Sequence, residues 1–302
     1  MPVLLLVLGA CSGHRREPAP VATVADAGPQ ATRVADAASL PFTGAAPAAG
    51  ACDGRPRPVG PGLTHERWPI DATPAIPLEA CVDLVRGDLA HLELRVVTAS
   101  RDGQARPVPR WLADLHLLAA INSGMFLEGG RSIGLLVDGA HVDQPRDNRR
   151  LGGYLAFGPR AAGAPAVVIT GRDCAGFDLA ALRARYRSVV QSYRLLGCHG
   201  EALPWADPKA YSAAAIALDR AGRVVLVHVR APFLMRELSR ALAAPALGLT
   251  GALFVEGGPE ATVAVAGDHP LLLLGSYETG FVEDDGNQEP WALPNLIALA
   301  LR

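Results

Sequence analysis

The chain has 302 residues, of which 50% are hydrophobic, and its formal net charge is −2 at pH 7. This length and composition suffice for a domain with a buried core and exclude a chain that is disordered throughout. No basic block runs along the sequence, so we expect no nucleic-acid partner. Lys209 is the only lysine. The preference for arginine fits either a coding bias or the binding of phosphate and carboxylate groups.

The N-terminus has the pattern of an export signal. Val3 to Leu8 form a short apolar run, and the run ends in a Leu-Gly-Ala-Cys sequence at Cys11 that resembles a lipobox. A membrane-spanning helix needs about 20 residues, so this run is too short to span. We expect residues 1–11 to be a lipoprotein signal peptide with Cys11 lipidated. The protein would then be exported to the cell envelope (outer membrane or periplasm) and contact the membrane only through its lipid anchor. No Lys or Arg precedes the run, and a chance apolar N-terminus is the alternative.

Residues 12–62 are rich in Ala, Pro and Gly and show no helical or strand periodicity. This composition is typical of a disordered tether that holds a domain away from a membrane. The folded domain is expected over residues 63–302. A disulfide at Cys52 would pin the end of the tether to it.

Four further cysteines are available for disulfides: Cys52, Cys81, Cys174 and Cys198. In an oxidising compartment they permit two disulfides in three connectivities, and we expect the sequential pairing. No Cys-x-x-Cys pair occurs, which argues against a zinc or thioredoxin-like site. We predict no metal site and no cofactor.

Strands dominate the elements that the pattern predicts within the domain. Alternating or continuous apolar residues predict strands over residues 91–97, 119–126, 154–157, 166–170, 252–255 and 296–301. A short hairpin is expected over residues 135–142. Helical spacing occurs over residues 109–118, 179–190 and 233–247.

The clearest hairpin joins residues 213–218 to residues 224–229 through a turn that contains Gly222. Both arms are apolar throughout, so we expect the sheet to be covered on both faces here. His228 lies in the second arm and is expected to be a core histidine with satisfied hydrogen bonds. Together the elements predict an α+β fold, a single domain with a mixed, largely antiparallel sheet and packed helices.

Three apolar stretches end abruptly in polar residues. These ends are Asn122-Ser123-Gly124, Gln191-Ser192-Tyr193-Arg194 and Glu256-Gly257-Gly258-Pro259-Glu260. The polar ends of neighbouring strands can meet at one place, and glycines there let a ligand approach the backbone closely. We therefore predict a binding site at these ends, although each alone also fits an ordinary exit from a strand.

Five segments follow one another in an order that is typical of one enzyme family. Residues 119–126 are similar to an Asn-Ala-Gly-Phe-Phe segment, and residues 190–192 to a Gln-Ser-Gly-Pro segment. Residues 212–219 resemble a strand that usually reads Arg-Thr-Ala-Ile-Gly. Residues 252–261 resemble a Leu-Asp-Gly-Gly-Gly-Ser block, and residues 293–297 a closing Pro-Asn-Ala-Ile strand. Over residues 63–302 the chain thus resembles the phosphodiester glycosidase family.

The resemblance implies hydrolysis of the bond between a sugar's anomeric carbon and a phosphodiester oxygen. Because the leaving phosphate is stable as an anion, this chemistry mainly needs a catalytic carboxylate and cationic donors for the phosphate. The family's Asp falls on Glu256, which is our first choice for the carboxylate that activates water or stabilises the anomeric centre. Glu260 is its expected partner. The alternatives are a Glu256 that accepts hydrogen bonds from the turn and a solvated Glu260.

The sequence departs from the family's pattern at several site positions. The Arg-Thr pair falls on Ala213-Ala214, and the Gly-Pro pair falls on Tyr193-Arg194. The Ser after the glycines falls on Glu260. We therefore expect a retained scaffold with an altered site.

Substrate contacts are expected from Asn122, Ser123, Gly124, Gln191, Ser192, Arg194, Arg230, Gly257 and Gly258. The two arginines are candidates to hold a phosphate through paired donors, with structural ion pairs as the alternative. The expected function is that of an exported lipoprotein hydrolase that cleaves a glycosyl phosphodiester bond, with a glycan or sugar phosphate as its substrate. The alternative is a non-catalytic, glycan-binding surface lipoprotein on the same scaffold.

Overall fold

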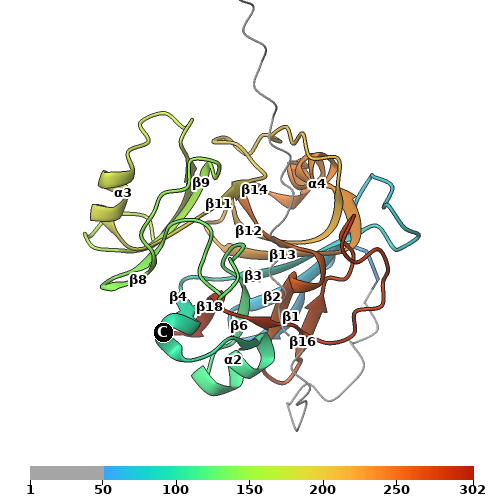
Figure 1. Ribbon diagram of the computed structural model, residues 1–302, viewed down its shortest axis with the longest axis horizontal. Helices are drawn as coiled ribbons and strands as arrows, with labels where there is room; N and C mark the ends of the chain where they lie inside the picture. The colour runs from blue at the N-terminus through green and yellow to red at the C-terminus, as the bar shows by residue number, and fades with distance from the viewer. Residues whose placement is uncertain (1–50) are drawn as a thin grey trace, which may run out of the picture.

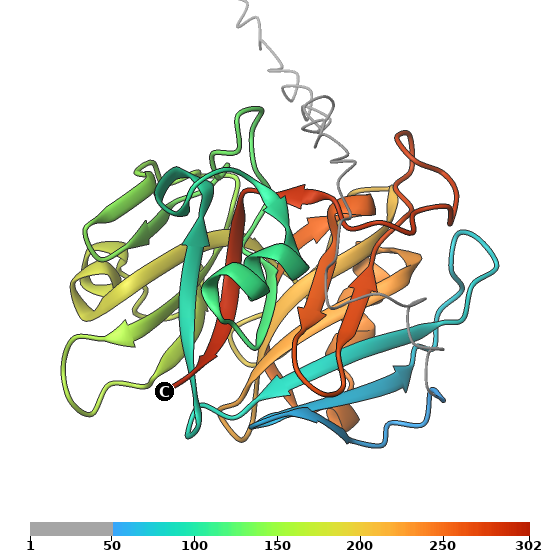
Figure 2. The same ribbon diagram turned by 90° about the horizontal axis from the view of Figure 1, so that it is seen from below.

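Two antiparallel sheets pack against each other in the folded part of the chain, as Figures 1 and 2 show. The computed structural model describes residues 51–302. The predictions for Cys11, for the signal peptide and for most of the tether therefore lie outside the described residues.

The larger sheet has eleven strands. Its main path runs through β1 (Arg57–Gly60), β2 (Leu63–Pro69), β3 (Cys81–Gly87), β13 (Val224–Leu234), β12 (Ala210–Asp219), β14 (Leu249–Gly257), β11 (Tyr186–Arg194), β7 (Leu136–Asp138) and β8 (His141–Gln144). Two more strands extend it from β11: β9 (Gly153–Pro159) and then β10 (Val167–Gly171).

The smaller sheet has five strands. Their order is β16 (Leu271–Leu274), β15 (Thr262–Val265), β6 (Ala119–Asn122), β18 (Asn295–Leu301) and β4 (Leu92–Thr98). A separate two-stranded ribbon pairs β17 (Ala292–Leu293) with β5 (Arg106–Pro107). Strands β12 and β13 form the predicted long hairpin, and β7 and β8 form the predicted short one.

Helices are few and short. They are α1 (Ala99–Asp102), α2 (Val108–Leu115), α3 (Leu179–Arg185), α4 (Met235–Leu242) and the 3-10 turns η1 (Pro245–Leu247) and η2 (Gly258–Glu260). The expected packed helices are therefore an overstatement: α2 and α4 bury an apolar face against a sheet, while α3 packs the half-buried Leu179 and Leu182 there. The expected mixed sheet is also wrong, since every strand pair within residues 51–302 is antiparallel.

Apolar side chains fill three layers around the sheets. Between the sheets, Ile216 and Leu226 of the larger sheet meet Ile121 and Ile297 of the smaller one. The other face of the larger sheet is covered by α4, and the other face of the smaller sheet is covered by α2. The prediction that the long hairpin is covered on both faces is confirmed, because β12 and β13 contribute to both neighbouring layers.

Two element boundaries differ from the sequence prediction. The helix expected over residues 179–190 ends at Arg185, where β11 begins. From Tyr186 the chain enters the sheet, and the β-branched Val189 and Val190 are fully buried there. The other difference is β1 (Arg57–Gly60), which pairs with β2 although residues 57–60 were expected in the tether. The ordered part thus begins before Leu63.

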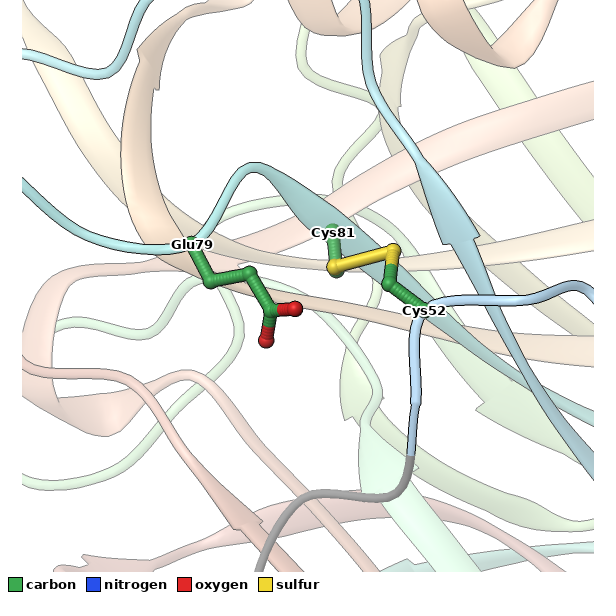
Figure 3. A group of neighbouring side chains, drawn as sticks. All are labelled: Cys52, Glu79 and Cys81. Carbon is green, nitrogen blue, oxygen red and sulfur yellow. A yellow bond between two sulfur atoms is a disulfide. The ribbon is translucent and has the colours of Figure 1, made fainter.

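The sequential disulfide pairing is confirmed. Cys52 is bonded to Cys81 and Cys174 to Cys198, with Cα–Cα distances of 6.2 and 5.6 Å. The first bond fastens the segment before β1 to the start of β3, beside Glu79 (Figure 3). No helix within residues 51–302 has the length and apolar character needed to cross a membrane.

Candidate active site

Strand β14 ends in a turn that carries two of the predicted catalytic residues. After the buried Val255 come Glu256 and Gly257, and the chain reverses at Gly258, which has a φ of +65°. Turn η2 then brings Glu260 back toward the strand. A Cβ on Gly258 would lie 3.6 Å from Glu260 Oε2 and 2.8 Å from an oxygen of Glu278. Glycine is therefore required here both by the left-handed backbone and by the crowded carboxylates.

The carboxyl groups of this turn are buried. Glu256 is 8% exposed and Glu260 is 5% exposed. Burial raises the pKa of Glu256 well above its usual value, and the charges of Glu260 and Glu278 raise it further. The Gly257 N–H, which donates to Glu256 Oε1 over 3.1 Å, opposes the shift. Burial also raises the pKa of Glu260 to about 8, with a smaller contribution from Glu278. The two groups thus resist being charged together, so the pair retains a proton at neutral pH.

Glu278 is a third carboxylate of the site, and the sequence prediction missed it. It lies after β16, and its N–H donates to the carbonyl of Val282 over 2.7 Å. Burial raises the pKa of Glu278, and the nearby charge of Lys209 lowers it. The signal was present in the sequence, because the apolar run 271–274 ends in Gly-Ser-Tyr-Glu-Thr-Gly, as the other three stretches end in polar residues.

Four aromatic rings lie on the α4 face of the larger sheet, beside Gly257 of the turn. The Phe254 ring lies 5.6 Å from Trp205 and 6.5 Å from Tyr211, and Trp205 lies 5.5 Å from Tyr193, all between ring centroids. A Cβ on Gly257 would lie 3.1 Å from Tyr211 and 3.3 Å from Phe254. This aromatic group (Tyr193, Trp205, Tyr211 and Phe254) offers the flat apolar surfaces on which sugar rings stack.

The end of β6 meets the turn directly. Asn122 Nδ2 donates to the carbonyl of Glu260 over 3.1 Å, and its Oδ1 accepts the Thr262 N–H over 2.9 Å. Asn122 therefore fixes the turn, and its side chain is buried away from the surface. The Ser123 hydroxyl is buried and has no hydrogen-bond partner within residues 51–302. Gly124 passes close to β11, where a Cβ would lie 3.9 Å from the Ser192 hydroxyl.

Gln191 and Ser192 also make internal bonds. The Gln191 Oε1 accepts N–H groups of Leu135 and Asn148 over 3.0 and 2.9 Å. Its Nε2 lies 2.8 Å from each of Asp147 Oδ1 and the Asn148 and Leu151 carbonyls. The Ser192 hydroxyl donates to the carbonyl of Phe254. The Gln191 amide thus fastens the loop 147–151 to β11, and neither side chain is free for substrate.

The two predicted phosphate-binding arginines lie elsewhere. The Arg194 guanidinium pairs with Asp173 over 2.5 Å and contacts the sulfur of Cys174 over 3.0 Å. The Arg230 guanidinium pairs with Asp285 over 2.7 Å and donates to the carbonyls of Leu274 and Asn287. Both act as structural ion pairs, because a counterion close in the fold neutralises each of them.

One line of residues crosses the larger sheet and ends at the site. Arg67, Asp83, His228, Ala214 and Glu256 face one another in register on five neighbouring strands. His228 is buried in the core, as expected, and its ring meets the backbone of Ala261. Burial lowers the pKa of His228 to about 4. Ala214, at the position of the family's Thr, separates this neutral ring from Glu256.

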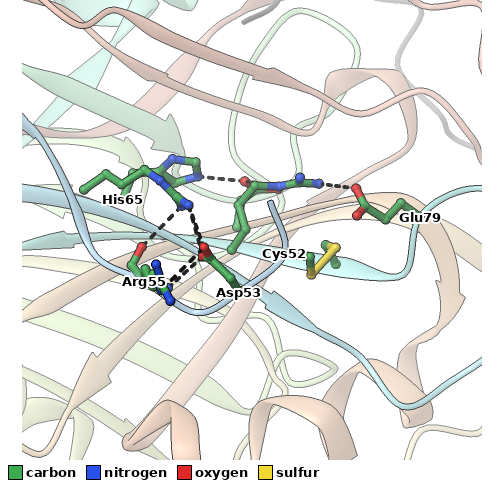
Figure 4. The surroundings of a disulfide bond; sticks show 9 residues. Cys52, Asp53, Arg55, His65 and Glu79 are labelled. Carbon is green, nitrogen blue, oxygen red and sulfur yellow. Dashed lines mark hydrogen bonds and ion pairs between the residues drawn. A yellow bond between two sulfur atoms is a disulfide. The ribbon is translucent and has the colours of Figure 1, made fainter. Parts of the chain in front are cut away.

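Two groups of potential metal ligands occur within residues 51–302, both away from this site. One is Cys52, Glu79 and Cys81, and the other contains the second disulfide with Asp173. In each group the sulfurs are joined to each other, so they offer no thiolate. Glu79 instead pairs with Arg67 over 3.0 Å, in the network of charged groups around the first disulfide (Figure 4).

Comparison with known proteins agrees with this arrangement. The sequence pattern that defines the phosphodiester glycosidases matches residues 116–300, which span β6, the end of β11, the β14 turn and β18. The chain belongs to the phosphodiester glycosidase family. The family assignment made from the five ordered segments is thereby confirmed.

Solved structures share the fold. The catalytic domain of zebrafish N-acetylglucosamine-1-phosphodiester alpha-N-acetylglucosaminidase, auto-inhibited by its pro-peptide, superposes with a TM-score of 0.58 at 16% identity and covers 80% of this chain and 85% of its own. A hypothetical protein from Synechocystis gives a TM-score of 0.51 at 15% identity, over 80% of this chain and 62% of its own. A comparison with curated protein sequences gave no match.

Proposed function

We propose that this protein is an exported, lipid-anchored hydrolase that cleaves a glycosyl phosphodiester bond. The observation that carries the proposal is the β14 turn. Glu256 stands at the position of the family's Asp, is nearly inaccessible to water, and has the carboxyl group of Glu260 across a glycine reversal. Cleavage at an anomeric carbon uses two carboxyl groups whose surroundings set their protonation, and burial raises the pKa of both groups here.

The positions of Glu256 and Glu260 suggest a different role for each carboxyl group. Glu256, which accepts the Gly257 N–H, acts on the anomeric carbon, either by activating water or by stabilising the positive charge that develops there. Glu260 is its partner and controls the protonation of the pair. The leaving phosphate is stable as an anion and needs no proton, so the demand on the second carboxyl is smaller than with an alcohol leaving group.

The aromatic group supports a sugar as the ligand. Trp205 and Tyr193 are partly exposed beside the buried Phe254, so one face of this layer is available for stacking. Gly257 and Gly258 keep the backbone bare between the rings and the carboxylates. A sugar that stacks here would lie beside Gly257, at the end of β14.

Export is supported by the cysteines. Two disulfides in a chain of this size are typical of an oxidising compartment outside the cytosol. We keep the signal peptide over residues 1–11, lipidation at Cys11 and a tether that runs to the ordered segment at β1 as parts of the proposal. Metabolic labelling with a radioactive fatty acid tests the anchor, because Cys11→Ser would abolish the label.

The test of activity is hydrolysis by the mature chain with both disulfides intact. A panel of sugar-1-phosphodiesters is offered beside simple aryl glycosides and aryl phosphodiesters. Release of free sugar from the first set, and its loss in Glu256→Gln with substrate binding retained, is the expected result. Turnover that survives Glu256→Gln would remove Glu256 from the mechanism.

The second candidate function is non-catalytic glycan binding on the same scaffold. The observation that favours it is Ala213-Ala214, which lies opposite Gly257 and Glu256 in the sheet where the family has Arg-Thr. Under this alternative the folded protein would turn over none of the panel. Glu256→Gln would then change only the affinity for glycans.

A further inference from the structure

The disulfide between Cys174 and Cys198 has a cation against both of its sulfurs. The Arg194 guanidinium donates through Nη1 to Cys174 Sγ over 3.0 Å and to Cys198 Sγ over 3.2 Å. Its other terminal nitrogen, Nη2, pairs with Asp173 over 2.5 Å. Because Arg194 is only 8% exposed, water and salt screen its action on the sulfurs weakly.

Two glycines leave the room that this guanidinium occupies. Gly153 of β9 and Gly171 of β10 face each other in the ladder between these strands. A Cβ on Gly171 would lie 2.5 Å from Arg194 Nη1, and a Cβ on Gly153 would lie 2.5 Å from Arg194 Cγ. A side chain at either position would therefore displace Arg194 from the sulfurs.

The backbone at both cysteines is held without the S–S bond. The Cys174 N–H donates to the Gly171 carbonyl over 3.0 Å, and the Cys174 carbonyl accepts the Phe177 N–H over 3.1 Å. The turn that carries the other cysteine is closed by the Gly197 N–H, which donates to the Glu201 carbonyl over 2.7 Å. The two sulfurs should therefore stay near each other when the bond between them is broken, so that it can form again.

The surroundings of this bond favour its reduction. Both cysteines are half-buried in surface loops, where a reductant can reach them. A cation beside a cysteine sulfur stabilises the thiolate, and a stabilised thiolate leaves more easily when a disulfide is attacked. We infer that Cys174–Cys198 is a reversible redox site that accepts two electrons from a dithiol, such as the Cys-x-x-Cys pair of a thioredoxin-like protein.

The exchange takes place in two steps. A thiolate of the dithiol attacks one sulfur of the pair, the S–S bond breaks, and the other sulfur leaves as a thiolate that Arg194 Nη1 holds. The second thiol of the partner then attacks the mixed disulfide, and its proton passes to the cysteine that is released. The chain ends with one thiolate and one thiol, and the dithiol ends as a disulfide.

The other disulfide is a control within the same molecule. The sulfurs of Cys52 and Cys81 lie beside the carboxylate of Glu79 (Figure 3), and Cys81 is only 4% exposed. A neighbouring negative charge disfavours a thiolate, and burial keeps a reductant away. This bond should therefore resist a dithiol that reduces Cys174–Cys198.

The experiment measures both bonds in one sample. The full chain is equilibrated with graded ratios of reduced to oxidised dithiothreitol, free thiols are blocked, and mass spectrometry of the peptides reports each disulfide separately. We expect Cys174–Cys198 to be half reduced at a ratio at least about tenfold lower than Cys52–Cys81 needs. With thioredoxin as the reductant, Cys174–Cys198 should again be reduced first.

Two substitutions should move the ratio for Cys174–Cys198 in opposite directions. Arg194→Gln removes the cation and should raise the ratio at half reduction by about tenfold, with Arg194→Lys between it and the wild type. Asp173→Asn removes the charge that competes for Arg194 and should lower the ratio. The Asp173 side chain is 66% exposed, so this variant leaves the core intact.

Half reduction of both disulfides at the same ratio would overturn the inference. Shifts in the same direction for Arg194→Lys and Asp173→Asn, or no shift in either, would also overturn it, and these two variants decide even if Arg194→Gln does not fold. Failure of thioredoxin to reduce Cys174–Cys198 would exclude a protein dithiol as the donor. None of these measurements needs turnover, so they stand apart from the test of the proposed hydrolase.

Discussion

Asn122 and Glu260 are joined across the two sheets. The Asn122 side chain donates to the Glu260 carbonyl over 3.1 Å and accepts the N–H of Thr262 over 2.9 Å. The end of β6 thereby fixes the turn that carries both proposed catalytic carboxylates. The link explains why a polar residue at this strand end is buried to 1% exposure.

Replacing Asn122 by Ala should lower the free energy of unfolding by about 2 kcal/mol, because a buried N–H is left without an acceptor. Urea denaturation measures this loss. Ser123→Ala is the matched control: its hydroxyl has no partner within the described residues, so its removal should change stability by less than about 0.5 kcal/mol. Equal losses in both variants would show that the two Asn122 bonds contribute nothing specific.

Substitutions at Gly258 and at Gly222 distinguish the effect of backbone strain from the effect of displacing a carboxylate. A Cβ there would lie 2.8 Å from an oxygen of Glu278, whereas Gly222, with a similar φ of +75°, has nothing within 4 Å. Ala at either position should cost about 1 kcal/mol in stability, since both force a side chain into the left-handed region. Only Gly258→Ala should also reduce kcat/KM, because it displaces the Glu278 carboxyl. If Gly222→Ala reduced kcat/KM as much, the effect would not come from the site.

Glu260 should make the protein less stable as the pH rises. Burial raises its pKa to about 8 in the folded state, so the folded protein binds a proton that the unfolded chain has lost. Its contribution to stability is full below the unfolded pKa and is lost as the pH rises through about 8, and the raised pKa of Glu256 acts in the same direction. His228, with a pKa of about 4, has the opposite effect below pH 6.5 and none above it.

Urea denaturation between pH 6.5 and 8.5 therefore reports on the buried carboxyl groups of the site, and the raised pKa of Glu278 acts in the same direction. We expect stability to fall by up to about 1.4 kcal/mol per pH unit for each group. The fall should be smaller in Glu260→Gln, whose side chain stays neutral. An equally steep fall in wild type and variant would mean that Glu260 is ionised in the folded protein.

The fold was predictable from the sequence where its signals are local. The hairpin of β12 and β13 was found because Gly222 and a polar turn separate two apolar runs. The end of α3 was missed, since residues 186–190 keep helical spacing although the sheet takes them up. The local sequence does not show that the sheet will bind these residues, because tertiary contacts override local propensity.

The position of the site was predictable from the sequence, but the roles of its individual side chains were less so. The ends of β6, β11 and β14 do meet, as the contacts of Asn122 with Glu260 and of Gly124 with Ser192 show. Which polar groups remain free depends on partners far along the chain. Asp173 precedes Arg194 by 21 residues, and nothing in the sequence marks it as the counterion of that arginine.

Gln191 holds the loop 147–151 against β11, which gives a further prediction. In Gln191→Glu, a carboxylate replaces an amide that faces Asp147 and the carbonyls of Asn148 and Leu151. We expect a loss of at least about 3 kcal/mol, because the oxygen that replaces Nε2 would face acceptors that the amide had donated to. Gln144→Glu is the control, since its Nε2 faces the single carbonyl of Ser132 and should cost less. Hydrogen exchange should become faster across residues 147–151 in Gln191→Glu alone. If that loop kept its protection, it would be held by contacts other than Gln191, such as those of Arg172 with Asp147 and Asn148.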